Sequence, residues 1–146
     1  MNELKNLGKS TNYSFDYTPE VLEAIPNKNS DKNYFVKLNC EEFTCVCPVT
    51  SQPDFAKIKI RYIPDKFLVE SKSLKLYLTS YRNTGIFHEE VTNRIADDLI
   101  KLLNPRYLEV EGIFSVRGGI SIVPFVNFGR GEFENLAKER LARHEG

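Results

Sequence analysis

Two of the three cysteines of this chain and an aspartate crowd into the segment EFTCVCPVTSQPDF, residues 42–55. The third cysteine, Cys40, lies just upstream, and Asp54 follows Cys47 by seven positions. Four kinds of site are compatible with this crowding: a metal site, a disulfide, a set of inert buried thiols, and a nucleophilic thiol with a nearby proton donor. The rest of the chain has to distinguish among these four kinds of site.

The spacing of the cysteines argues against a metal site and against a disulfide. They follow the pattern C-x4-C-x-C without a C-x2-C pair, and the only histidines are His88 and His144. We expect a cytoplasmic protein, in which thiols stay reduced, and an odd number of cysteines disfavours complete pairing. Taken singly, each cysteine is by default a small buried side chain without chemistry. We therefore expect no metal, and spacing alone favours inert thiols over a nucleophile.

Length and composition are typical of one globular domain. The chain has 146 residues, of which 41% are hydrophobic and 27% charged, enough for one core. Its 20 basic and 20 acidic side chains balance, so no global field draws it to nucleic acid or to a membrane surface. Segment 1–14 lacks the apolar core of a signal peptide, and no run approaches a membrane span. We expect a single domain over residues 1–146, with an irregular arm at 1–30 and a helical tail at 130–146.

Hydrophobic periodicity predicts strands, then helices, then strands again. The expected strands span 34–39, 57–63, 107–116 and 120–126, and the expected helices span 73–82, 87–103 and 132–143. In the second strand Ile58, Ile60 and Tyr62 share one face, as in a sheet with one buried side. The order ββααββ, without regular βα alternation, predicts an α+β domain in which two helices cover one face of an antiparallel sheet. The other face then needs cover, and association through sheet edges is a natural outcome.

The first expected helix carries cations on the side opposite its apolar residues. Lys72, Lys75 and Arg82 share that side on a helical wheel. Ser71 or Ser73 can cap the helix start, where free N–H groups favour an anion. These features suit a phosphate site, although a solvated charged face is the commoner reason for such a pattern. Both interpretations stay open on these residues alone.

Other polar groups have two interpretations as well. Arg117, in a turn with two glycines, can add a phosphate contact if the fold or a neighbouring subunit brings it near. His88 falls on the apolar side of the second expected helix, with Glu89 at the boundary, so the pair can read the hydrogen-bonding edge of a ligand. A buried histidine satisfied by a backbone partner is the commoner case. Segment 129–131 (GRG) begins a dinucleotide fingerprint, but Glu134 and the lack of a βαβ unit exclude a Rossmann site.

The segment ESKSLKLY at 70–77 resembles the signature of the QueF family of NADPH-dependent 7-cyano-7-deazaguanine reductases. Further blocks resemble that family in the same order, at Cys47-Pro48, 52–55 (QPDF), 87–89 (FHE) and 117–119 (RGG). The resemblance covers roughly Tyr34 to Asn127. It implies the tunnelling fold (T-fold) shared with GTP cyclohydrolase I, and a ring-based homo-oligomer with active sites between subunits.

The resemblance also implies a reaction and a set of roles. Cys47 is expected to add to the nitrile of the substrate as a thioimide, and Asp54 to protonate the nitrile nitrogen. Two hydride deliveries from NADPH would then give the primary amine, a precursor of the tRNA nucleoside queuosine. The residues implied at the substrate are Val69, Glu70, Ser71, His88 and Glu89. Those implied at the cofactor are Ser71, Lys72, Lys75 and Arg117. Cys40 and Cys45 match no catalytic position and are expected to pack.

Two other functions stay open. A T-fold relative of the cyclohydrolase or pterin-binding type would act on a purine-like ring without reducing a nitrile. It would not need the basic helix, and a cyclohydrolase would need zinc ligands that the spacing of cysteine and histidine does not offer. A non-catalytic module would instead grip a phosphate ligand with that helix, and Cys47 and Asp54 would be dispensable. Consumption of NADPH in the presence of the nitrile substrate separates the three.

Overall fold

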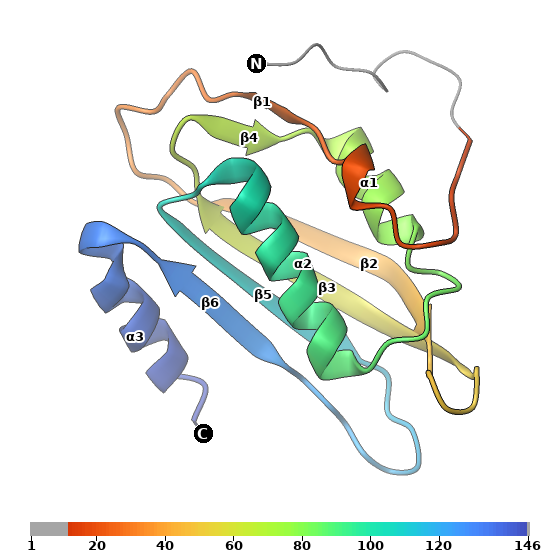
Figure 1. Cartoon of the computed structure of the whole chain (residues 1–146). Helices are drawn as coiled ribbons and strands as arrows, with labels where there is room; N and C mark the ends of the chain where they lie inside the picture. The colour runs from red at the N-terminus through yellow and green to blue at the C-terminus, as the bar shows by residue number, and fades with distance from the viewer. Residues whose placement is uncertain (1–11, 146) are drawn as a thin grey trace.

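The chain runs through two long strands, two helices and two further strands before a last helix (Figure 1). The computed structural model describes residues 12–145. Its elements are η1 (Pro19–Val21), β1 (Ala24–Pro26), β2 (Val36–Val46), β3 (Pro53–Ile63), β4 (Phe67–Val69), α1 (Ser71–Thr79), α2 (His88–Leu103), β5 (Tyr107–Phe114), β6 (Phe125–Gly129), η2 (Gly131–Phe133) and α3 (Glu134–Ala142). None of the helices within residues 12–145 is both long and apolar enough to cross a membrane.

The main sheet has the strand order β2-β3-β5-β6, and each neighbouring pair is antiparallel. With α1 and α2 between β3 and β5, the predicted ββααββ order and the α+β class are confirmed. The structure adds a two-stranded ribbon of β1 and β4, in which Ala24 pairs with Val69. The ribbon was not expected, because three-residue strands are too short to show a periodicity. Segment 1–11 of the expected irregular arm lies outside the described residues.

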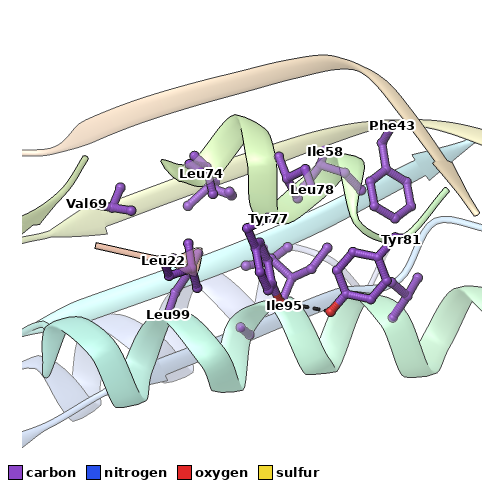
Figure 2. Close-up of a cluster of buried hydrophobic side chains, with 14 of the residues drawn as sticks. Leu22, Phe43, Ile58, Val69, Leu74, Tyr77, Leu78, Tyr81, Ile95 and Leu99 are labelled. Atoms are coloured by element: carbon purple, nitrogen blue, oxygen red, sulfur yellow. Dashed lines mark hydrogen bonds between the residues drawn. The ribbon is translucent and has the colours of Figure 1, made fainter. Parts of the chain in front are cut away.

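The core lies between the main sheet and the two central helices. The face predicted for β3 is confirmed, since Ile58 and Ile60 are 0% exposed and Tyr62 is 1% exposed. Ile95 and Leu99 of α2 are equally buried and belong to the same cluster. Figure 2 shows Ile58, Ile95 and Leu99 of this cluster between the helix and the strands, together with residues of α1. Alternation of side chains along β3 therefore fixes which face of the sheet receives the helices.

The far face of the sheet is covered in part by α3. Glu109 of β5 is buried, and its neighbours in sequence, Leu108 and Val110, point into the helical core. Because strand side chains alternate, Glu109 points to the opposite face. There its carboxylate accepts hydrogen bonds from Tyr107 Oη at 2.8 Å and from Arg140 Nε of α3 at 2.5 Å. A buried charge is tolerated when it is paired in this way, so the ion pair holds α3 on the sheet.

Several predicted boundaries were wrong, two of them for identifiable local reasons. The strands expected at 34–39 and 57–63 are longer in the structure, as β2 and β3. The strand expected at 120–126 is replaced by β6 at Phe125–Gly129. Pro124 has no N–H group with which to continue a ladder, although its carbonyl accepts a hydrogen bond from Gly112 at 3.0 Å. The helix expected at 73–82 instead spans Ser71–Thr79, because Glu70 caps it earlier than predicted. The expected tight turn at Arg117 is confirmed by reciprocal backbone hydrogen bonds with Ile120, both 3.1 Å long.

A hydrogen-bonded cluster of tyrosines joins α1 to α2. Asp98 of α2 accepts hydrogen bonds on Oδ2 from Tyr77 at 2.5 Å and from Tyr17 at 2.7 Å. Tyr77 and Tyr81 share a further hydrogen bond of 2.8 Å, and both rings are 0% exposed. Tyr77 is the last residue of the ESKSLKLY segment. The aromatic position of that segment therefore serves the core and fixes where the basic side of α1 points.

We expect Asp98→Ala to lower the free energy of unfolding by about 1–3 kcal/mol, because it leaves two tyrosine hydroxyls without their acceptor. Urea unfolding followed by circular dichroism measures this change. Asp97→Ala is the matched control, since Asp97 is the exposed carboxylate next to it on the same helix. Equal stability of the two variants would show that the cluster does not contribute as described.

Candidate active site

Cys47 lies at the start of the loop that joins β2 to β3, directly after the last residue of β2. The loop is closed by two backbone hydrogen bonds, from Cys47 N to Gln52 O at 2.8 Å and from Ser51 N to Cys47 O at 2.9 Å. Ser51 accepts a left-handed conformation, with φ of 59°, to make this closure. The loop thereby curls back on Cys47, whose side chain is only 7% exposed.

The linker between α1 and α2 packs against this loop. Val46 forms a backbone bridge with Gly85, with hydrogen bonds of 3.1 Å from Val46 N to Thr84 O and 3.0 Å from Ile86 N to Val46 O. A Cβ atom on Gly85 would lie 3.3 Å from the Cα atom of Pro48, closer than ordinary packing. A glycine at this position therefore lets the linker approach the Cys-Pro segment and brings the start of α2 toward the thiol.

The three cysteines differ in their surroundings. Hydrogen bonds from the Thr50 hydroxyl and from the backbone of Thr50 and Val49 lower the pKa of Cys47 from 9.0 to about 7, and Arg117 adds to the effect. Burial instead raises the pKa of Cys45 to about 12, and burial also raises the pKa of Cys40. Only a thiolate is a strong nucleophile. Cys47 is therefore the one thiol of the three that is partly ionised near neutral pH.

Asp54 is a buried carboxylate at the start of β3, where it pairs in register with Cys45. Its Oδ1 atom accepts a hydrogen bond from Arg117 Nη1 at 2.5 Å, and its Oδ2 atom lies 3.2 Å from His88 Nε2. The Asp54 side chain is 6% exposed, so both contacts are shielded from water. Charge-assisted hydrogen bonds of this kind are stronger than neutral ones, and they fix both oxygens of the carboxylate.

His88 is the first residue of α2, and its imidazole stacks on the ring of Phe114 with 3.9 Å between centroids and 7° between planes. Its second nitrogen, Nδ1, is buried without a hydrogen-bond partner among the residues that the structure describes. Stacking therefore sets the plane of the ring, while Asp54 takes one nitrogen. A polar atom left in this position is suited to a ligand.

Four segments thus meet at one place: the 47–52 loop, the start of β3 that directly follows it, and, from farther along the chain, the start of α2 and the turn after β5. The sequence predicted Cys47, Asp54 and His88 as site residues, and the structure brings them together. It also places Arg117 there, on Asp54, although the sequence suggested a phosphate contact for it. Thr50 was missed altogether. A hydroxyl three positions after a candidate nucleophile, in a loop rich in turn formers, is the signal that could have found it.

The start of α1 corrects one expectation. Neither Ser71 nor Ser73 caps the helix with its side chain. The carboxylate of Glu70 does, accepting hydrogen bonds of 2.8 Å from the backbone N–H groups of Lys72 and Ser73. The Ser73 hydroxyl instead donates to the Glu70 carbonyl oxygen at 2.7 Å. Glu70 has two carboxylate oxygens and can satisfy two free N–H groups at once, which a serine hydroxyl cannot.

The residues predicted at substrate and cofactor are divided between buried and exposed positions. Val69 lies in the core cluster and Glu70 is 7% exposed, so these two side chains hold the start of α1. Ser71 and Glu89 are exposed, each on the first turn of its helix. Within the described residues, the Glu89 side chain forms no hydrogen bond or ion pair with the cluster around Asp54, and it follows His88 at the rim. Within residues 12–145, no three side chains of His, Cys, Asp or Glu gather so that they would hold a metal ion.

An open groove of about 1010 Å³ lies between β2 and α1. Ser71 and Lys75 line it from the helix, and Arg82 lines it from the segment that follows the helix. Val46 and Pro53, the neighbours in sequence of Cys47 and Asp54, border it as well. The ring of Tyr13 lies 5.5 Å from the Lys75 ammonium, and a hydrogen bond that Lys75 donates to the Tyr13 side chain raises the pKa of Lys75. A groove with cations along one wall fits the phosphates of a dinucleotide.

An activated thiol, a buried acid and a histidine on one α+β scaffold are typical of an enzyme that adds a nucleophile to its substrate. A family model described as QueF-like protein matches residues 53–132. The chain is also similar to proteins called NADPH-dependent 7-cyano-7-deazaguanine reductase. The one from Streptococcus thermophilus is 58% identical over 149 aligned positions, covering 98% of this chain and 91% of that protein. The one from Parabacteroides distasonis is 59% identical over 144 positions, covering 97% and 92%.

A solved structure agrees with these sequence matches. The apo archaeosine synthase QueF-Like superposes with a TM-score of 0.62 at 25% identity, over 66% of this chain and 95% of that one. The extent of the family-model match and the sequence identity to the reductases together establish the family of this chain. The chain belongs to the QueF family.

The lowered pKa of Cys47 predicts a pH dependence that can be measured without a substrate. Alkylation of Cys47 by iodoacetamide should accelerate as the pH rises through about 7 and then level off, because the thiolate is lost below that pH. Thr50→Val should move the midpoint to higher pH, since it removes the hydroxyl that stabilises the thiolate, and Thr50→Ser should keep it near the wild-type value. Peptide mapping by mass spectrometry assigns the label to Cys47. A midpoint unchanged in Thr50→Val would contradict this assignment.

Proposed function

We propose that this protein reduces the nitrile of 7-cyano-7-deazaguanine to the primary amine of 7-aminomethyl-7-deazaguanine with NADPH, in the synthesis of queuosine. The observation that carries the proposal is that an activated thiol, Cys47, and the buried carboxylate of Asp54 are both linked to Arg117, in a member of the QueF family. A nitrile carbon is a poor hydride acceptor, and addition of a thiolate divides the reduction into easier steps. The relatives named above carry the name of this activity.

In the proposed mechanism, the sulfur of Cys47 adds to the nitrile carbon and one π bond of the nitrile breaks. The nitrogen gains an electron pair and needs a proton, which Asp54 delivers, and the product is a thioimide. The thiol proton and the new N–H balance, so this step is not a redox step. NADPH, when bound, supplies the hydrides that complete the reduction to the amine. The protein therefore has to orient the nitrile between Cys47 and Asp54 and keep water away from both.

The remaining site residues are proposed to bind the two substrates. His88, with its free Nδ1 atom, and the adjoining Glu89 would contact the hydrogen-bonding edge of the deazapurine, with Ser71 and the Val69–Glu70 turn beside it. The phosphates of NADPH would lie along α1 at Ser71, Lys72 and Lys75, where the groove opens. Glu70 would act indirectly, since its carboxylate is committed to the helix start.

The assembly proposed for this family member is a T-fold homo-oligomer in the cytoplasm, with active sites between subunits. Two observations support association. The main sheet ends in β2 on one side and β6 on the other, and neither strand has an outer partner within residues 12–145. Unpaired edges are usually covered in stable proteins. In addition, Phe55 and Phe87 are more than half exposed beside the thiol site, as residues at an interface or a binding face are.

The proposed function predicts a covalent adduct that forms without cofactor. Incubation with 7-cyano-7-deazaguanine alone should add the mass of one substrate to the protein, and intact-mass spectrometry detects it. Cys47→Ala should remain unmodified because it lacks the nucleophile. Cys45→Ala is the matched control and should keep both the adduct and the NADPH-dependent turnover. An adduct that survives in Cys47→Ala would show that another group is the nucleophile.

The proposed cofactor site predicts a separate effect of Lys75. A charge-assisted contact with a phosphate contributes about 1.5–3 kcal/mol, so Lys75→Ala should raise the KM for NADPH by roughly ten-fold or more. Formation of the adduct should persist, since it needs no cofactor. Lys101→Ala, which removes an exposed lysine at the end of α2, is the control for a general loss of charge. If the KM for NADPH is the same in both variants, the basic side of α1 is only a solvated face.

A further inference from the structure

Arg117 occupies a position that its sequence context did not predict. It belongs to an exposed turn after β5, in which Gly118 and Gly119 have positive φ angles of 61° and 77°. Its side chain nevertheless turns inward and donates a hydrogen bond from Nη1 to Asp54 Oδ1 at 2.5 Å. The arginine side chain is 41% exposed and the aspartate side chain 6% exposed, so the contact lies at the mouth of the site.

Both oxygens of the Asp54 carboxylate have a neighbouring side chain as partner. Arg117 takes one carboxylate oxygen, and His88 Nε2 lies 3.2 Å from the other. The His88 ring is itself fixed by its stack on Phe114. Removal of Arg117 would leave one oxygen of a buried carboxylate without its donor, and such a group either turns toward another partner or admits water.

The same side chain also acts on the nucleophile, because Arg117 is one of the groups that lower the pKa of Cys47. One side chain therefore influences both groups that the addition step requires. A guanidinium suits this position, since its several N–H groups lie in one plane and can serve two acceptors at once. A lysine offers a single ammonium on a flexible stem and matches such a fork poorly.

We propose that Arg117 is a positioning residue for the addition of the thiol to the nitrile, because it holds the Asp54 carboxylate in place next to the loop that carries Cys47. The inference rests on the proposed function. In the step concerned, the S–C bond forms, one nitrile π bond breaks, and the proton released from sulfur ends on nitrogen by way of Asp54. No electrons are supplied from outside. Arg117 acts before any cofactor is needed, which separates this role from a contact with a phosphate.

The test measures single-turnover adduct formation with 7-cyano-7-deazaguanine in the absence of NADPH, by intact mass against time. Arg117→Ala should slow the reaction about ten-fold to a hundred-fold, as expected for loss of a charge-assisted hydrogen bond to a buried group. Arg117→Lys should recover part of the rate and stay several-fold below the wild type. Arg143→Ala is the control, since it removes an exposed arginine of the C-terminal segment and should react at the wild-type rate.

A binding measurement distinguishes positioning from a general loss of structure. On a Cys47→Ala background, the Kd for 7-cyano-7-deazaguanine should change little when Arg117→Ala is added, because the substrate site itself is intact. Slow adduct formation with unchanged binding supports the proposal. Should Arg117→Ala not fold, Arg117→Lys decides alone, and a wild-type rate in that variant overturns the proposal.

Two other outcomes are decisive. Wild-type adduct formation in Arg117→Ala, with a raised KM for NADPH in turnover, would assign Arg117 to the cofactor and overturn the positioning role while leaving the proposed function in place. Absence of an adduct in the wild-type protein would overturn the proposed function itself, and the positioning role with it. The two failures are therefore distinguishable by the wild-type reaction alone.

Discussion

A buried carboxylate needs hydrogen-bond partners, and the arrangement around Asp54 follows from that requirement. Its two oxygens meet Arg117 and His88, which both follow it in the sequence but belong to separate segments. To supply them, the turn after β5 must fold back over the start of β3, and α2 must begin at His88 rather than a residue later. The same arrangement places the Cys47 loop beside the acid. The architecture of the site is thus fixed by the cost of leaving one aspartate without partners.

The residues of the ESKSLKLY segment have two different roles. Glu70 caps α1 and Tyr77 joins the cluster around Asp98, so these two residues fix the start and the rotation of the helix. The start and the rotation of the helix then set the directions in which the side chains between these two residues point. Lys75 faces the groove beside β2. A recognisable motif of this kind need not consist of binding residues only. Part of it positions the helix on which the binding residues lie.

Local patterns predicted much of the fold, and the errors have definable causes. Alternation in β3 and helical spacing in α2 were read correctly because one face of each element is buried along its length. The strand expected at 120–126 was wrong because Pro124 interrupts the ladder, and the β1–β4 ribbon was too short to leave a pattern. For the site, Cys47, Asp54 and His88 could be named from the motifs. Thr50 belongs to none of these motifs, and its effect became clear only from how the loop curls around the sulfur.

The sequence by itself determined the order of the elements, the buried faces, the family and the presence of a cysteine, an acid and a basic helix. It could do so because periodicity and motifs are local properties that neighbouring residues carry. Only the tertiary structure decided which cysteine is ionised and which residue Arg117 contacts. The first outcome depends on burial and on how the 47–52 loop curls around the sulfur. The second depends on a hydrogen bond between segments more than 60 residues apart, from Arg117 to Asp54. Distances of that kind arise when the chain folds, and no local pattern records them.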